Sequence, residues 1–387
     1  MERSIRTLIG CAGLSASLGT VHAWSLFLEP LENHLDVGRG WVSAVYSVCL
    51  AAITAAVLVG HRLFTLLPGW CVVGLSAGGA TVGLVGAAQA NHWWLLVLSY
   101  GLIFGLANGI GYSFALQRSS EATPTASRSL ALVTAAYALG AAAAAIALKG
   151  PVDAHGAARG FLILAGCVGA SGIAAALLVG GTRSPKPDRR ISASLGLSTS
   201  VVRIWVSYGL ASLAGLTALG HAAAIVDLAG GPGGTTVALT GFASAAGGIA
   251  MIAVVRPFGQ RIAALVLPLS TATLLATAAL AEGVGWVAAT SVIGVAAAYG
   301  ALIAIYPAIV HRRFGARNYP TAYGRVFTAW GLAGLLGPLG AGALFDASGG
   351  YRLPLFLAAI LAITSTFVAR GTSRCETEFD STEKASF

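Results

Sequence analysis

Charged side chains are scarce in this sequence. Only 10% of the 387 residues are Asp, Glu, Lys or Arg, whereas about 25% is usual in soluble domains. Hydrophobic residues make up 56% of the chain, and the mean hydropathy is +0.80. No ordinary soluble fold could cover so much apolar surface, so the composition excludes that class and predicts a polytopic membrane protein.

Lysine is almost absent, and the cysteines show no pattern. The three lysines are Lys149, Lys186 and Lys384, and none is followed by Ser or Thr, as a phosphate-binding Walker A loop requires. ATP hydrolysis within this chain is therefore excluded. The five cysteines have neither metal-ligand spacing nor a disulfide framework. Because the apolar segments also lack paired carboxylates or a nucleophile beside a base, we expect no enzyme activity, no cofactor and no bound metal.

Apolar segments recur along the whole chain, each near the roughly 20 residues that a helix needs to cross a bilayer. The first six are 7–30, 40–61, 70–90, 93–117, 127–149 and 157–181. The second six are 203–228, 235–255, 262–282, 286–310, 322–344 and 352–370. The sequence therefore predicts an all-α polytopic membrane protein of twelve transmembrane helices in two six-helix halves, 1–181 and 203–370. The polar, basic stretch 182–202 is the expected cytoplasmic linker, and 371–387 the expected disordered tail.

Basic residues are distributed unevenly between the two sides of this predicted topology. If the N-terminus is cytoplasmic, 19 of the 23 Lys and Arg residues lie on the cytoplasmic side. The other four are Arg39, Lys149, Arg159 and Arg352. Cytoplasmic loops carry such an excess, so we expect a multi-pass protein of the cell membrane with both termini in the cytoplasm. The net charge of +9 thus marks topology, and we expect no nucleic-acid partner.

A glycine-rich stretch at 325–342 contains glycines at every third position, namely Gly331, Gly334, Gly337 and Gly340. We expect a nearly bare helix face there, which lets a neighbouring helix or a substrate approach closely. Trp330 lies among these glycines, away from the span ends where membrane tryptophans gather. It is expected either to fill a groove or to line a cavity. Twelve residues separate Arg325 from Gly337, as they separate Arg128 from Gly140, which favours two related halves.

Several motifs resemble the major facilitator superfamily, and within it the oxalate/formate antiporter and monocarboxylate transporter branch. They are Gly-Thr-Val-His-Ala-Trp-Ser-Leu-Phe-Leu-Glu-Pro-Leu at 19–31, the glycine-rich stretch 100–112 that ends in Tyr, Tyr-Pro-Ala at 306–308, Phe-Gly at 314–315 and Tyr-Gly-Arg-Val-Phe-Thr-Ala-Trp-Gly at 323–331. The resemblance covers essentially the whole chain. It implies a transporter that works by alternating access, with two halves rocking about a central site.

The departures from this branch concern its fixed cations. Oxalate-type members hold substrate carboxylates with a Lys in the eleventh span and an Arg in the eighth. The corresponding positions here are Trp330 and a position near Gly248. A dianion in a low-dielectric cavity without a paired cation is very costly, so oxalate is not the expected substrate. The superfamily's loop signature after span two is also degraded, at 60–69.

Titratable side chains within the spans are rare, and His22 and His221 are the central ones, in spans one and seven. Both are predicted to face one cavity, binding a carboxylate or taking a proton, because histidine titrates near neutral pH. The alternative is a neutral His that is hydrogen-bonded to a helix carbonyl or a Ser. Glu29, at the end of span one, is either a further proton site or a solvated interfacial carboxylate.

Four tyrosines complete the predicted substrate site. Tyr112 and Tyr137 fall where the branch places aromatic residues that wall its cavity, and Tyr46 and Tyr299 are also mid-span. A buried phenol needs a partner, which a cavity or another side chain can supply. Each tyrosine therefore either lines the cavity or packs with a satisfied hydroxyl.

The sequence thus predicts a secondary active transporter of a small, monocarboxylate-like organic acid, working as a symporter or antiporter with proton coupling as an option. One alternative is an exporter of a hydrophobic or natural-product compound, since Trp330 suits a neutral, bulky ligand. Another is a membrane sensor that binds without net flux. The expected partners are a small-molecule substrate, protons and the lipid bilayer, and the protein is expected to be a monomer.

Overall fold

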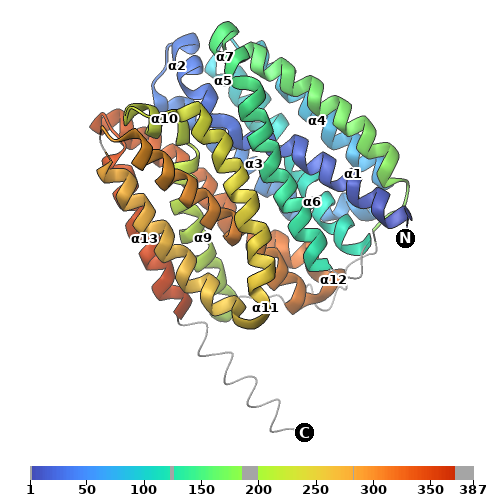
Figure 1. The fold of residues 1–387 in the computed structure, drawn as a ribbon. Helices are drawn as coiled ribbons and strands as arrows, with labels where there is room; N and C mark the ends of the chain where they lie inside the picture. The colour runs from blue at the N-terminus through green and yellow to red at the C-terminus, as the bar shows by residue number, and fades with distance from the viewer. Residues whose placement is uncertain (1, 123–125, 185–198, 282, 371–387) are drawn as a thin grey trace.

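All regular structure in the described part of the chain is helical (Figure 1). The computed structural model describes residues 2–122, 126–184, 199–281 and 283–370. The elements in chain order are α1 (Glu2–Gly19), η1 (Thr20–Phe27), α2 (Leu28–Leu35), α3 (Arg39–Leu66), α4 (Gly69–Ala88), α5 (Trp93–Leu96), η2 (Val97–Phe104), α6 (Gly105–Ala122), α7 (Ala126–Val179), α9 (Thr199–Leu219), α10 (Ala222–Leu228), α11 (Gly233–Leu280), α12 (Gly285–Ser348) and α13 (Arg352–Arg370).

Helices cover all twelve predicted spans. Ten helical segments in the described ranges are long and apolar enough to cross a membrane. One of them, Arg128–Val179, has 52 residues and contains Gly156 with a φ of 74°. Glycine adopts this left-handed conformation without a steric penalty, so the chain turns there and the segment supplies two spans. The shorter apolar segment Leu265–Leu280 corresponds to the ninth predicted span.

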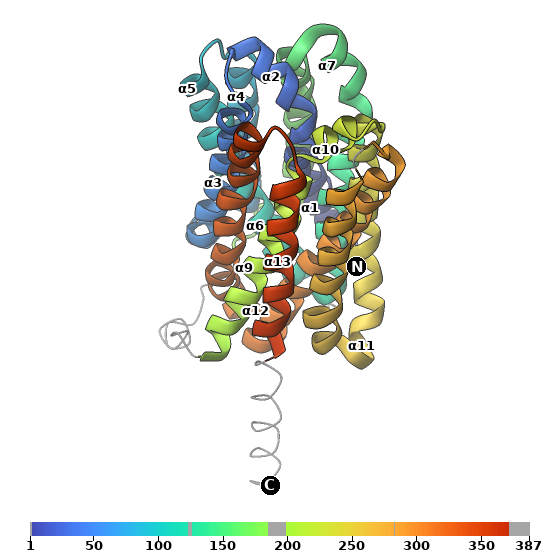
Figure 2. The same cartoon turned by 90° about the vertical axis from the view of Figure 1, so that its left-hand side faces the viewer.

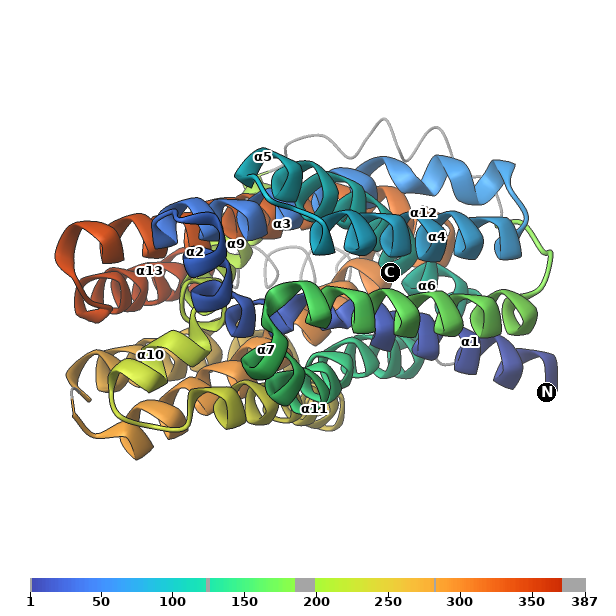
Figure 3. The same cartoon turned by 90° about the horizontal axis from the view of Figure 1, so that it is seen from above.

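The two sets of helices lie largely on different sides of the molecule. In Figure 3 the first set, coloured blue to green, lies mainly to the right, and the second, coloured yellow to red, mainly to the left. They meet along two seams, where α3 packs on α12 and α7 packs on α11 (Figure 2). The predicted all-α architecture with two six-helix halves is thereby confirmed. Most of the predicted linker, at 185–198, and the predicted tail at 371–387 lie outside the described residues.

The glycines of α12 allow these close contacts, but they do not form one bare face. A Cβ added to Gly334 would lie 2.7 Å from the Cβ of Leu50 in α3. A Cβ added to Gly337 would instead lie 3.2 Å from the backbone nitrogen of Thr217 in α9. Since a helix has 3.6 residues per turn, a three-residue spacing drifts by about 60° per step. The glycines therefore serve two neighbouring helices, and Gly140 likewise abuts Ala16 of α1.

The first and fourth predicted spans are not regular α-helices. Between α1 and α2 the chain forms the 3₁₀ segment η1, which contains His22 and Trp24. The fourth span contains the π-helical segment η2 before α6 begins. Such departures from α-helical geometry are often found at functional sites, because they turn side chains away from the positions that a regular helix would give them. In this chain η1 places His22 at the central cavity.

Candidate functional site

A cavity lies between the two sets of helices. Five of the seven predicted substrate-binding residues line it, and they come from both halves. They are His22 of η1, Tyr112 of α6, Tyr137 of α7, and Tyr299 and Trp330 of α12. The structure thus brings these side chains together, and their role in binding a substrate stays a prediction.

The His22 side of the cavity is held by buried partners. Nδ1 of His22 forms a 2.8 Å hydrogen bond with the hydroxyl of Tyr46, and the His22 ring meets the Tyr137 ring edge to face, with centroids 5.5 Å apart. Tyr46 is itself only 1% exposed and stacks on Trp24. It does not line the cavity as predicted, because it lies behind His22, where it orients the imidazole.

Tyr137 is fixed by a side-chain amide that the sequence analysis did not single out. Its hydroxyl donates to Oδ1 of Asn108 (3.0 Å), and the amide nitrogen of Asn108 donates to the carbonyl oxygen of Leu18 (2.7 Å). This chain ties α7 and α6 to α1. The ring of Tyr137 therefore presents its face at a fixed position beside Tyr112, with ring centroids 4.8 Å apart.

The opposite wall consists of aromatic side chains of α12. The indole nitrogen of Trp330 donates to the hydroxyl of Tyr299 (2.5 Å), and the Trp330 ring stacks on Phe327 with centroids 4.6 Å apart. Phe327 in turn lies 6.3 Å from the ring of Tyr112, so the aromatic wall continues from one half to the other. Phe327 was not predicted, although its spacing of three residues from Trp330 puts both on neighbouring positions of one helix.

No Asp, Glu, Lys or Arg of the described residues lines this cavity. Gly248 and Trp330, which stand at or near the positions of the branch's fixed cations, are both in its wall. Polar side chains of both halves line the cavity, among them His22 and Ser244. In the described part of the chain, the bond of His22 to Tyr46 uses only Nδ1, which leaves Nε2 for a ligand. The site can therefore bind a ligand that has an apolar body and an uncompensated polar group.

His221 lies elsewhere, so the expectation that both histidines face one cavity is wrong. It is fully buried between α9 and α10, and it does not line the central cavity. Its Nε2 bonds with the carbonyl oxygen of Pro338 (3.0 Å) and its Nδ1 with the hydroxyl of Tyr351 (2.9 Å). The chain leaves regular helix after Leu219, which places His221 beyond the cavity wall.

Glu29 is also outside the central cavity. It is exposed at the start of α2, where it lines a separate, more open cavity together with Lys149, Asp153 and Asp227. Lys149 and Asp153 form an exposed ion pair (2.8 Å). This setting corresponds to the solvated interfacial carboxylate that the sequence left open as the alternative to a proton site.

Comparisons with known proteins identify the architecture. No protein-family model matches the sequence, and no curated protein matches it. Among solved structures, the human organic anion transporter MFSD10 (TETRAN) is similar with a TM-score of 0.71 and 16% identity, over 95% of this chain and 99% of that one. A bacterial homologue of the human lysosomal transporter Spinster, solved inward-facing, has a TM-score of 0.69 and 13% identity, over 96% and 97% of the two chains.

The nucleoside transporter NupG is similar as well, with a TM-score of 0.72 and 10% identity, over 96% of this chain and 99% of that one. These likenesses define the class of fold, that of the polytopic membrane transporters. More particularly, the chain has the major facilitator fold that the sequence resemblance implied. The names of all three neighbours describe transporters. The resemblance to the oxalate/formate and monocarboxylate branch stays a prediction.

Proposed function

We propose that this protein is a secondary active transporter that moves a small, monocarboxylate-like organic acid by alternating access. The observation that carries the proposal is the central cavity, whose walls come from both halves of a major facilitator fold. Rocking the halves about such a cavity exposes it to each side of the membrane in turn. One similar structure, at 16% identity, belongs to an organic anion transporter.

The chemistry of the lining favours a ligand with a single acidic group. A second carboxylate would need a cation, since an unpaired charge at low dielectric is very costly, and the described lining supplies none. One carboxyl group can be met by Nε2 of His22 and the hydroxyl of Ser244. If His22 carries a proton alongside the anion, the moving assembly is neutral, which is the physical basis for proton symport.

A second candidate is export of a hydrophobic compound. The stacked rings of Phe327 and Trp330 face the rings of Tyr112 and Tyr137 across the cavity. Aromatic walls of this kind bind flat apolar ligands through their large contact area. On this reading the neutral lining and Trp330 are adaptations to an uncharged, bulky molecule, and His22 contributes only a hydrogen bond.

A thermal-shift screen of the purified protein separates these candidates, because a ligand raises the unfolding temperature of the state that it binds. The panel contains matched monocarboxylates, the corresponding dicarboxylates and uncharged hydrophobic compounds. We expect the monocarboxylates to stabilise the protein most, and to accumulate in proteoliposomes with an imposed proton gradient. Stabilisation by hydrophobic compounds alone would favour the second candidate. Binding without flux in either direction would favour a sensor.

A further inference from the structure

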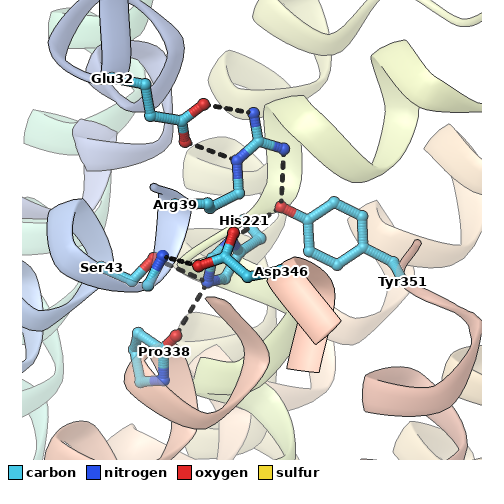
Figure 4. Close-up of polar contacts among 8 residues, drawn as sticks. Glu32, Arg39, Ser43, His221, Pro338, Asp346 and Tyr351 are labelled. Carbon is cyan, nitrogen blue, oxygen red and sulfur yellow. Dashed lines mark hydrogen bonds and ion pairs between the residues drawn. The ribbon is translucent and has the colours of Figure 1, made fainter. Parts of the chain in front are cut away.

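A chain of polar contacts crosses between the halves at the end of the bundle that carries α2, hereafter the α2 end (Figure 4). It begins at Glu32 in α2 and passes through Arg39, the first residue of α3. It then reaches Tyr351, between α12 and α13, and His221, before α10. It ends at the backbone of Pro338 in α12. The first two residues belong to one half, and the last three to the other.

Arg39 donates toward both ends of this chain, and from Tyr351 onward each donor points toward Pro338. Nε and Nη2 of Arg39 donate to the two carboxylate oxygens of Glu32 (2.6 and 2.9 Å), and Nη1 donates to the hydroxyl of Tyr351 (3.2 Å). At the far end the carbonyl oxygen of Pro338 can only accept, so Nε2 of His221 carries a hydrogen and donates to it. Nδ1 of the neutral imidazole then accepts from the hydroxyl of Tyr351.

Every polar group in this arrangement therefore has a partner, although the network runs from a partly exposed ion pair into the core. The side chains of Arg39 and Glu32 are 15% and 17% exposed, Tyr351 is 4% exposed and His221 is 0% exposed. Removing one member leaves a buried donor or acceptor unpaired, which costs more than the hydrogen bond itself contributes. The guanidinium of Arg39 also lies over the ring of Phe345, 4.4 Å from its centroid.

Direct contacts between α3 and α12 surround this chain. The backbone N–H of Gly40 donates to Oδ2 of Asp346 (2.8 Å), and the N–H of Leu339 donates to the hydroxyl of Ser47 (3.1 Å). A Cβ added to Gly342 would lie 3.0 Å from the Cβ of Ser43. The two backbones are therefore almost in contact, and any opening of the α2 end that separates α3 from α12 must break these bonds together with the polar chain.

We propose that Glu32, Arg39, Tyr351 and His221 form a latch that holds the α2 end of the central cavity closed. The inference rests on the alternating-access mechanism proposed above. It identifies the contacts that must break when the cavity opens at the α2 end. Leu219 lines the cavity and lies two residues before His221. A ligand that displaces the wall at Leu219 acts directly on the segment that carries the latch histidine.

Disulfide formation across the seam measures how often the α2 end is closed. In a variant without the native cysteines, Ser43→Cys combined with Gly342→Cys places two thiols within bridging reach. Every protein compared carries this pair, so the loss of the 3.4 Å contact between the Ser43 hydroxyl and Nε2 of His221 is common to all of them. The initial rate of oxidation by a copper–phenanthroline reagent is compared in otherwise matched proteins that also carry Arg39→Gln or Tyr351→Phe. We expect each latch substitution to lower this rate several-fold, because α3 and α12 then spend less time in contact.

The matched control is Arg352→Gln, which removes an exposed arginine next to Tyr351 and should leave the rate unchanged. Tyr351→Phe keeps the ring and removes only the hydroxyl, so it tests the latch even if Arg39→Gln does not fold. Equal rates in all these proteins would overturn the latch, whatever the substrate. If no transported substrate is found, the proposed function fails, but the oxidation rates still decide whether these residues hold the α2 end closed.

Discussion

Trp330 and Tyr299 are joined by a hydrogen bond from the indole nitrogen to the phenol oxygen, in the wall of the central cavity. The bond links the two membrane-spanning parts of α12, Gly285–His311 and Thr321–Ser348. It leaves the face of the indole stacked against Phe327. By the predicted resemblance Trp330 corresponds to a lysine of the oxalate-type branch, and in this chain the position presents an aromatic surface without charge.

The first prediction concerns this bond. Trp330→Phe removes the indole N–H and leaves the buried hydroxyl of Tyr299 without its donor, so we expect a loss of about 1–3 kcal/mol in the free energy of unfolding. Trp286→Phe is the control, since Trp286 lies at the start of α12 and is 71% exposed. Thermal unfolding in detergent measures both. Equal shifts in the two variants would show that the bond does not stabilise the cavity wall.

The second prediction concerns His22, the one imidazole in the described cavity lining. His22→Ala removes the Nε2 that faces the cavity and should abolish accumulation of the substrate in proteoliposomes. Tyr46→Phe, which frees Nδ1 of His22 from its 2.8 Å bond, should only weaken accumulation, because the imidazole stays but is less well oriented. His92→Ala, at an exposed histidine before α5, should have no effect. Accumulation that survives His22→Ala would remove His22 from the mechanism.

The architecture was predicted well from the sequence. A membrane architecture follows from the composition and the lengths of the apolar segments, and neither requires knowledge of how the helices pack. Tyr112 and Tyr137 were expected at the cavity from the resemblance to the branch, and Tyr299 because a buried phenol needs a partner. Trp330 was expected either to fill a groove or to line a cavity, and all four line it. The sequence could not show that His22 lines the cavity whereas Tyr46 lies behind it. His22 lies in the 3₁₀ segment η1, which has three residues per turn instead of 3.6. The direction of its side chain therefore cannot be calculated from the geometry of a regular α-helix.

The placement of His221 failed for a related reason. It was predicted to face the cavity from its place in span seven, which assumes one continuous helix over 203–228, whereas α9 ends at Leu219. Its partner Tyr351 is 130 residues away in sequence, in a short connection without periodicity. A contact of this kind depends on how the two halves meet, which no local pattern encodes.

The third prediction tests the close approach of α7 to α1. A Cβ at Gly140 would overlap the carbonyl oxygen of Ala16, so Gly140→Ala has to push the helices apart, at a cost of about 1–3 kcal/mol in the free energy of unfolding. Gly166→Ala is the control, in the span of α7 that follows the turn at Gly156, because nothing lies within 4 Å of a Cβ added there. That variant should be neutral or gain up to about 1 kcal/mol from helix propensity. A stable Gly140→Ala protein would contradict the packing of α7 on α1.

The fourth prediction tests whether the missing cation sets the ligand class. Trp330→Lys puts an ammonium group at the cavity wall, where it can pair with a carboxylate that the native lining leaves uncompensated. We expect this variant to be less stable alone but to gain stability with a dicarboxylate such as oxalate. A free ligand concentration of 100 times Kd would raise the free energy of unfolding by about 2.7 kcal/mol. Trp330→Leu is the control, since it removes the same ring without adding charge. If oxalate stabilises both variants equally, the absence of a cation at residue 330 is not what excludes dianions from this cavity.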